Sequence, residues 1–222
     1  SPALLWLFGL MVVPCLLILV LAFFRRGIYG GIEYTWTFEN IALVFDPLYF
    51  QIFMKSAGIA GLSAAIACVL GYAAAYAIAA MPRRNQPLLL FFAVLPFWSN
   101  YLVRTYAWIV LLNREGLIVN FARWLGFEGE LPSMLYTEQA VVIGLVYNYL
   151  PFVILSCYAP LSRLNSEVTE ASLDLGASRW TTFRRIVLPM TVPGLATGFV
   201  FVFVLSIGNF VTPALLGGGQ FQ

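Results

Sequence analysis

Five long apolar segments constrain this chain more than any other feature of its sequence. They cover residues 4–24, 56–80, 88–112, 139–160 and 191–216, and none of them contains an aspartate or a glutamate. About 20 consecutive apolar residues are enough for a helix to cross the hydrocarbon core of a bilayer. Backbone groups inside a bilayer must find hydrogen bonds within the protein, so we expect each segment to be helical. The sequence therefore predicts an all-α, polytopic membrane protein with a single transmembrane domain over residues 1–222.

The composition agrees with this class and excludes several kinds of site. The chain is 61% hydrophobic and 10% charged, whereas soluble domains carry about 25% charged residues. It has no histidine, so Ser-His-Asp or Cys-His catalysis cannot occur and we expect no metal site. The single lysine, Lys55, follows a methionine, so the chain lacks a phosphate-binding P-loop. A net charge of +2 does not favour nucleic acid. We expect no catalytic residue and no cofactor bound by this chain.

Two of the apolar segments, residues 4–24 and 56–80, contain further information about their roles. A cleaved signal peptide is the alternative for residues 4–24, but no positive segment precedes that run and no small-x-small site follows it before Arg25. In residues 56–80, small side chains recur at every fourth position with Val69 as the one larger member, which favours close approach of another helix over a channel lining. These residues, which we interpret as a packing stripe, are Ala57, Gly61, Ala65, Ala73 and Ala77.

Polar and amphipathic side chains gather near helix-breaking residues inside the predicted spans. Irregular backbone in a membrane is tolerated where it lines a cavity or is buried in protein. We predict that these groups share a solute path, while core packing and a polar seam against a partner remain the alternatives. The candidate residues are Trp98, Asn100 and Tyr101 near Pro96, Tyr147 and Asn148 near Pro151, and Asn209 beside Gly208.

Arg104 is the charged residue inside a predicted span. A charge in a span costs several kcal/mol unless it is paired or wetted. Two roles follow from this cost. Arg104 either anchors the structure by reaching headgroups or helix-end carbonyls, or lies at the rim of a cavity, where it repels cations or fixes a gate.

The longest polar stretch, residues 163–189, predicts two short helices joined at Gly176. The first covers about Ser166 to Leu175, with Asn165 or Ser166 positioned to cap it. Glycine tolerates the left-handed conformation that ends helices, so Gly176 ends this one. Ser178 can cap the second helix, whose apolar residues recur at helical spacing.

The spacing in this stretch resembles the cytoplasmic EAA loop of permease subunits in bacterial binding-protein-dependent ABC importers. Glu170-Ala171-Ser172 is followed after three residues by Gly176 and after nine more by Ile186, then by Leu188-Pro189. Ser172 departs from the family, which usually has a second alanine there. The resemblance implies that residues 161–190 form a cytoplasmic coupling loop. Its implied contacts with an ATPase are Glu170, Ala171, Ser172, Gly176, Leu188 and Pro189.

Three further segments resemble the spermidine/putrescine-type branch, and within it the B-type permease. They are Pro96-Phe97-Trp98 with residues 103–108, residues 147–152, and residues 210–218. This implies the type I importer permease fold, with six spans expected in the family and five visible here. Position 209 is often acidic in relatives but is Asn209 here, which puts direct charge pairing with a polyamine in doubt.

The resemblance also implies a setting and a function. We expect a multi-pass protein of the bacterial cell inner membrane, in contact with lipid, that moves a polyamine inward by alternating access. The implied partners are a second homologous permease in a heterodimer, two ATPase subunits that bind ATP and Mg, and a periplasmic solute-binding protein. The first alternative is an importer of the same kind that moves iron(III), an oxyanion or a betaine. The further alternatives are an ion-driven carrier and a membrane scaffold.

The orientation rests mainly on the resemblance. With residues 161–190 inside, six basic residues face the cytoplasm and five face outward, which is a weak positive-inside signal.

Overall fold

The computed structural model describes residues 2–27, 31–126 and 134–218. It divides into two compact units, residues 1–55 and 56–222. The single transmembrane domain stays a prediction. We describe each unit by itself. Helix α3 (Pro47–Ala79) begins in the first unit and continues through the second.

The first unit contains an apolar helix, a β-hairpin and a short helix. Helix α1 runs from Pro2 to Leu21, strands β1 (Phe24–Arg26) and β2 (Ile32–Trp36) pair antiparallel, and α2 runs from Glu39 to Val44. The Asn40 amide donates to the carbonyls of Ala22 and Phe24 at 3.0 and 2.8 Å, which ties α2 to the end of α1. The exposed ion pair between Arg25 and Glu39 adds at most about 1 kcal/mol.

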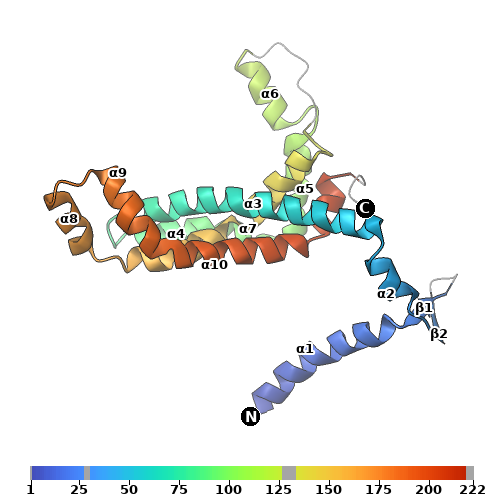
Figure 1. Ribbon diagram of the computed structural model, residues 1–222. Coiled ribbons are helices and arrows are strands. Elements are labelled where there is room, and N and C mark those ends of the chain that lie inside the picture. Colours follow the sequence, from blue (N-terminus) through green and yellow to red (C-terminus); the bar gives the residue numbers. More distant parts are fainter. Residues whose placement is uncertain (1, 28–30, 127–133, 219–222) are drawn as a thin grey trace. The chain divides into compact units, whose positions relative to one another are not determined.

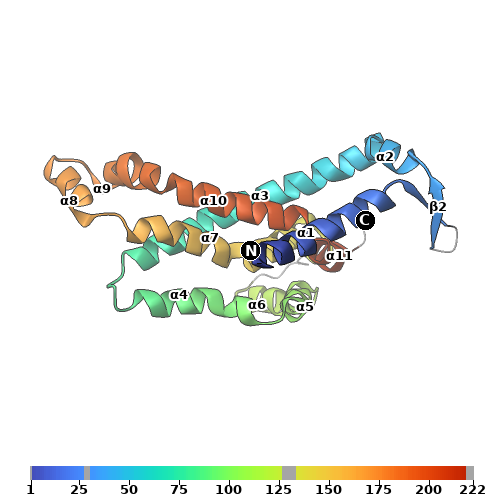
Figure 2. The ribbon, with the colours of Figure 1, turned by 90° about the horizontal axis from the view of Figure 1, so that it is seen from below.

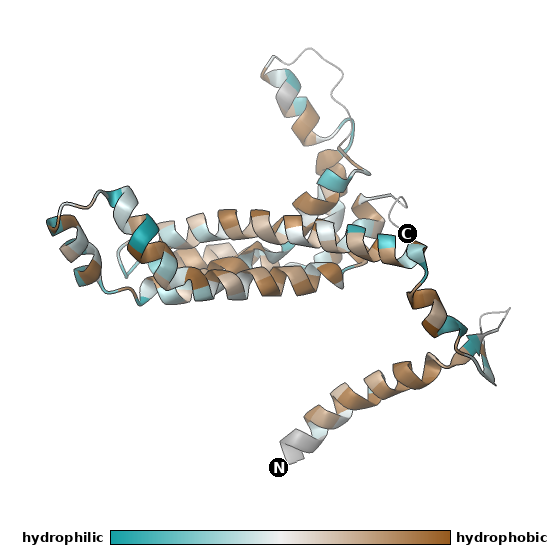
Figure 3. Cartoon of the chain, in the orientation of Figure 1, coloured by the Kyte–Doolittle hydropathy of each residue, from teal (hydrophilic) through white to brown (hydrophobic). Residues whose placement is uncertain are grey.

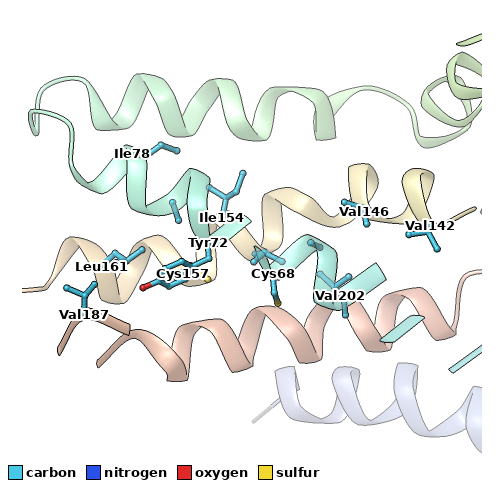
Figure 4. Packing of buried hydrophobic residues seen from close by; sticks show 14 residues of the cluster. Cys68, Tyr72, Ile78, Val142, Val146, Ile154, Cys157, Leu161, Val187 and Val202 are labelled. Carbon is cyan, nitrogen blue, oxygen red and sulfur yellow. The ribbon is translucent and has the colours of Figure 1, made fainter. Parts of the chain in front are cut away.

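Three long helices form the core of the second unit: α3, α7 (Glu138–Ser162) and α10 (Leu188–Ile207). Figures 1 and 2 show them side by side, and Figure 4 shows the buried side chains between them. Glycines permit the close approach. A Cβ on Gly71 would lie 2.7 Å from Val153, and one on Gly198 would lie 2.6 Å from the Ser156 hydroxyl. Close backbone contact of this kind is how membrane helices pack without large apolar side chains.

The predicted span over residues 88–112 is broken into three parts. Helix α4 (Gln86–Val94) leads into the 3₁₀ turn η1 (Leu95–Trp98), and α5 (Tyr101–Leu112) follows. The segment Gln86–Trp98 meets Tyr101–Phe121 at 87°. Pro96 lacks a backbone N–H and Asn100 caps α5 by accepting from the Leu102 amide at 2.8 Å, so one helix ends and another begins here. Helix α6 (Leu117–Trp124) follows α5.

The polar stretch forms two short helices at one end of the second unit. They are α8 (Ser166–Asp174) and α9 (Arg179–Thr182), and the π-helical segment η2 (Phe183–Val187) joins α9 to α10. Asn165 caps α8 and Ser178 caps α9, and both were among the predicted capping residues. Gly176 has φ +84°, the left-handed conformation expected of a helix-ending glycine. Figure 3 shows hydrophilic residues gathered here, while hydrophobic residues cover the long helices.

At the opposite end, α10 stops at Gly208 and the short helix α11 (Val211–Leu216) begins after Phe210. Three helices in the described part of the chain are long and apolar enough to cross a membrane: Pro47–Ala79, Glu138–Ser162 and Arg179–Ile207. The bent pair passes the same test when counted as one span, and Trp6–Leu21 is a shorter apolar helix. The exact limits of the five spans stay a prediction.

Candidate functional site

Asn209 connects three helices at the break between α10 and α11. Its side-chain amide Nδ2 donates to the hydroxyl of Tyr101 on α5 and to the hydroxyl of Tyr149 on α7, both at 2.7 Å. Its Oδ1 accepts from the Thr212 backbone N–H at 3.0 Å and from the Tyr101 hydroxyl at 3.1 Å. We call Tyr101, Tyr149, Asn209 and Thr212 the Asn209 cluster.

The hydrogen-bonding capacity of Asn209 is used within the cluster. An amide offers two N–H donors and one carbonyl acceptor with two lone pairs, and the four contacts above occupy all of them. The tyrosine hydroxyls differ, because each has one proton and two lone pairs. Tyr149 sends its proton to the Leu205 carbonyl at 3.3 Å, and Tyr101 also contacts the Thr212 hydroxyl. Because the Tyr101 proton is directed to Asn209 Oδ1, Thr212 is the donor to the Tyr101 oxygen and fills its second lone pair. The remaining acceptor capacity of the cluster therefore lies on the Tyr149 oxygen and the Thr212 hydroxyl.

Aromatic rings extend the cluster along α7 and α10. The Phe152 ring lies 6.4 Å from that of Tyr149, meets Phe97 edge-on at 5.2 Å, and stacks on Phe201 at 6.4 Å. Phe97 and Phe201 are exposed on the surface of this chain. Hydroxyl oxygens and exposed ring faces thus occur next to one another on η1, α7 and α10.

Arg104 is buried on α5, and its charge is directed into the protein. Its Nη1 donates to the Pro96 carbonyl at 2.6 Å, and its guanidinium lies 5.5 Å from the centre of the Phe97 ring. The Ser99 hydroxyl donates to the same carbonyl at 2.7 Å. Arg104 therefore contacts a helix-end carbonyl, as its anchoring role requires, and it does so at the 87° bend.

Of the six residues predicted for the solute path, Tyr101 and Asn209 meet in the Asn209 cluster. The other four lie outside it. Trp98 is exposed and contacts Phe91 edge-on at 5.8 Å, and the Asn100 side chain is used to cap α5. Tyr147 packs against Trp108 with ring centres 5.4 Å apart. Asn148 is 2% exposed, and its amide makes no hydrogen bond to any residue that the structure describes.

The sequence pattern predicted Tyr147 and Asn148 for the solute path, but not their neighbour Tyr149. The three residues are consecutive on α7 and point in different directions, since successive helical residues are rotated by about 100°. Tyr149 lies three residues before Phe152, a spacing that places both on one face of a helix. That spacing was the available signal, but it does not say which face meets α10.

The coupling-loop residues lie around an open groove between α8 and the helix formed by α9 and η2. The groove has a volume of about 610 Å³. The Ser172 hydroxyl on α8 contacts that of Thr182 on α9 at 3.0 Å and holds the two helices together. The lining residues are Glu167, Val168, Ala171, Ser172, Leu175, Ala177, Thr181, Arg185 and Ile186.

The six predicted coupling residues are spread over this region. Ala171 and Ser172 line the groove, Glu170 is exposed on α8, and Gly176 forms the turn after it. Leu188 and Pro189 are the first residues of α10 and do not line the groove. Leu175 is 89% exposed, which leaves a large apolar side chain on the outer surface of the loop.

Comparison with known proteins identifies the family. Residues 81–222 match the family described as binding-protein-dependent transport system inner membrane component. The chain is 37% identical over 216 residues to the spermidine/putrescine transport system permease protein PotB of Escherichia coli (strain K12). That similarity covers 97% of this chain and 78% of PotB.

Solved structures support the same fold. A bacterial ABC transporter involved in the import of alginate matches 99% of this chain and 76% of its own, with a TM-score of 0.75 and 19% identity. A second alginate transporter structure, in complex with an alginate-bound periplasmic protein, matches 90% of this chain and 68% of its own, with a TM-score of 0.68 and 20% identity. The chain therefore belongs to the inner membrane components of binding-protein-dependent transport systems and has the type I ABC importer permease fold.

Proposed function

We propose that this permease subunit moves a polyamine, such as spermidine or putrescine, inward across the bacterial inner membrane. The observation that carries the proposal is the 37% identity to a spermidine/putrescine permease over 97% of the chain. The alternatives of iron(III), an oxyanion or a betaine have no comparable support.

The chemistry of the Asn209 cluster supports a cationic solute. An ammonium group has only donors, and the cluster offers the Tyr149 phenol oxygen near the exposed ring of Phe201. A cation over an aromatic face gains about 0.5–2 kcal/mol. Because Arg104 is buried against the Pro96 carbonyl and the Phe97 ring, its charge is partly compensated within the protein. We assign solute contact to Tyr149, and its positioning to Asn209, which Tyr101 in turn holds.

The same proposal includes the partners of the complex. A second homologous permease completes the pathway, a periplasmic solute-binding protein delivers the polyamine, and two ATPase subunits bind ATP and Mg. The groove between α8 and α9 and the exposed Leu175 offer an ATPase subunit an apolar surface at the hydrophilic end of the bundle. No covalent chemistry is assigned to this chain.

Uptake by the reconstituted complex tests the solute. The permease pair, the ATPase subunits and the binding protein are placed in liposomes with ATP inside, and labelled spermidine is added outside. We expect ATP-dependent uptake that unlabelled putrescine reduces and that iron(III), phosphate and glycine betaine leave unchanged. Uptake of one of these three, with no uptake of spermidine, would contradict the polyamine assignment while leaving the permease role intact.

Gly176 provides a matched test of the coupling loop. Its φ of +84° suits glycine, and a residue with a branched Cβ pays about 1–2 kcal/mol in this conformation. We expect Gly176→Val to reduce the stimulation of ATP hydrolysis by the loaded binding protein. Gly176→Asn should behave like the parent chain, because asparagine tolerates this conformation. Equal stimulation in both variants would argue against a role for the turn.

A further inference from the structure

Large aromatic side chains connect the coupling loop to helix α3. The Phe183 ring, at the start of η2, meets Tyr76 edge-on at 5.6 Å and Tyr72 at 6.1 Å. On its other side it stacks on Trp180 of α9, with ring centres 5.6 Å apart and planes 23° from parallel. Phe183 is thus held between the loop and two tyrosines of α3.

A buried pair of hydroxyl groups makes a second connection, between helices α3 and α10. The Tyr72 hydroxyl lies 2.8 Å from the Thr191 hydroxyl on α10, and both side chains are buried. Figure 4 shows Tyr72 extending from α3 into the core near Cys157 and Val187. The single proton of Thr191 is directed to the carbonyls of Val187 and Leu188, at 2.9 and 3.1 Å. Tyr72 is therefore the donor to Thr191.

The backbone between these contacts is π-helical. Residues Phe183–Val187 form η2, and the Leu188 N–H bonds the carbonyl five residues earlier, that of Phe183. A π-helical turn inserted in an α-helix is rare and occurs frequently at functional sites. Thr191 bonds the carbonyl of Val187, the last residue of this turn, so Tyr72 is linked to the irregular backbone through one hydroxyl.

We propose that Tyr72, Tyr76, Phe183 and Thr191 form a joint that transmits displacement of the coupling loop to helix α3. This inference rests on the proposed coupling of α8 and α9 to an ATPase subunit. The path is continuous: Ser172 bonds Thr182, Phe183 follows in the chain, and its ring is held by both tyrosines. The four residues are positioning residues, because they act between the loop and helices α3 and α10.

Hydrogen exchange of the complete complex tests the joint without any solute. The permease pair and ATPase subunits are placed in nanodiscs, with and without ATP under conditions that prevent hydrolysis. In the parent complex we expect ATP to alter exchange in peptides from α8–α9 and in peptides covering residues 64–79. In Phe183→Ala the loop should still respond, while the response of residues 64–79 falls about fivefold or more, as lost coupling between sites predicts.

Further variants separate the joint from simple destabilisation. Phe199→Ala is the matched control, because Phe199 is on α10 and stacks on Phe203 of the same helix. It should respond like the parent. Phe183→Leu keeps apolar volume and should show the same loss as Phe183→Ala. Tyr72→Phe and Thr191→Val remove the same hydrogen bond, so the double variant should lose no more response than the stronger single variant.

Two results would overturn the joint, and they are distinguishable. If residues 64–79 respond fully to ATP in an assembled Phe183→Ala complex, the joint is wrong and coupling through α8–α9 stands. If ATP leaves the α8–α9 peptides of the parent complex unchanged, both the joint and the proposed coupling function are wrong. The number of solute molecules moved per ATP hydrolysed provides a second readout, which should fall about fivefold in Phe183→Ala.

Discussion

Individual residues at the helix breaks satisfy freed backbone groups, and several of them belong to the candidate site. Each break frees backbone groups that must be satisfied inside the protein. Arg104 and Ser99 satisfy the Pro96 carbonyl, and the Asn209 side chain accepts from the first turn of α11. The side chains that close the breaks are therefore polar, and they gather where irregular backbone lies next to aromatic rings.

Replacing Asn209 tests its contribution to the stability of the helix break. Asn209→Leu removes four contacts with Tyr101, Tyr149 and Thr212. At about 1 kcal/mol each, the expected loss of stability is about 2–4 kcal/mol. Asn209→Asp keeps an acceptor for the Tyr101 hydroxyl and for the Thr212 N–H, so it should fold better than the leucine variant. Thermal unfolding in detergent measures the difference, and equal midpoints would contradict the bonding described for the amide.

Arg104→Met tests the anchor at the bend. The substitution keeps apolar bulk but leaves the Pro96 carbonyl with one donor fewer. A hydrogen bond from a charged group contributes about 1.5–3 kcal/mol, and a loss of this size should appear in the unfolding midpoint. Arg114→Met is the control, because Arg114 is exposed after α5. If both variants unfold alike, Arg104 does not anchor the bend.

At the scale of elements, glycines decide which helices come together. The packing stripe predicted on α3 is half-buried or exposed in this chain, at Ala57, Gly61, Ala65, Ala73 and Ala77. The buried face of α3 contains Gly71 instead, which allows Val153 of α7 to approach. The predicted stripe therefore does not make the contacts within the second unit, and its packing role stays a prediction.

Two glycine substitutions on α3 should have opposite effects. A Cβ at Gly71 would lie 2.7 Å from Val153, and overpacking of this kind costs about 1–3 kcal/mol. At Gly58 the same Cβ meets no heavy atom within 4 Å, so alanine should stabilise the helix by up to about 1 kcal/mol. Unfolding midpoints of Gly71→Ala and Gly58→Ala check this. A stabilised Gly71→Ala variant would contradict the close approach of α3 and α7.

For the whole molecule, the second unit places the coupling loop and the helix breaks at opposite ends. The pair α8–α9, with its hydrophilic residues, lies at one end of the long helices, and α5, α6 and α11 lie at the other (Figures 1 and 3). This arrangement fits the proposed function, in which ATPase subunits bind at one end of the bundle and solute enters at the other.

Labelling from each side of the membrane tests the orientation. In a background with Cys15, Cys68 and Cys157 replaced by alanine, single cysteines are introduced as Arg179→Cys on α9 and Arg114→Cys after α5. A membrane-impermeant thiol reagent should label the second in intact spheroplasts and the first only after the membrane is opened. The reverse result would place the coupling loop outside and contradict the proposed function.

The sequence by itself determined the features that depend on local chemistry. Apolar length predicted helices in a membrane, and the capping residues and Gly176 predicted two short helices in residues 163–189. The spacing of Glu170, Gly176 and Pro189 identified the family, which the comparisons confirmed. These signals lie within a few turns of chain, where propensity, capping and periodicity act directly.

Only the tertiary structure decided which faces of the helices meet. It selected Tyr149 over Tyr147 as the partner of Asn209, buried Asn148, and directed Arg104 toward the Pro96 carbonyl. It also brought Tyr72 and Tyr76 to Phe183, more than a hundred residues away in the chain. In helices that are apolar on most sides, hydrophobicity does not mark the buried face. That choice depends on small residues and side-chain fit between helices, which no single segment contains.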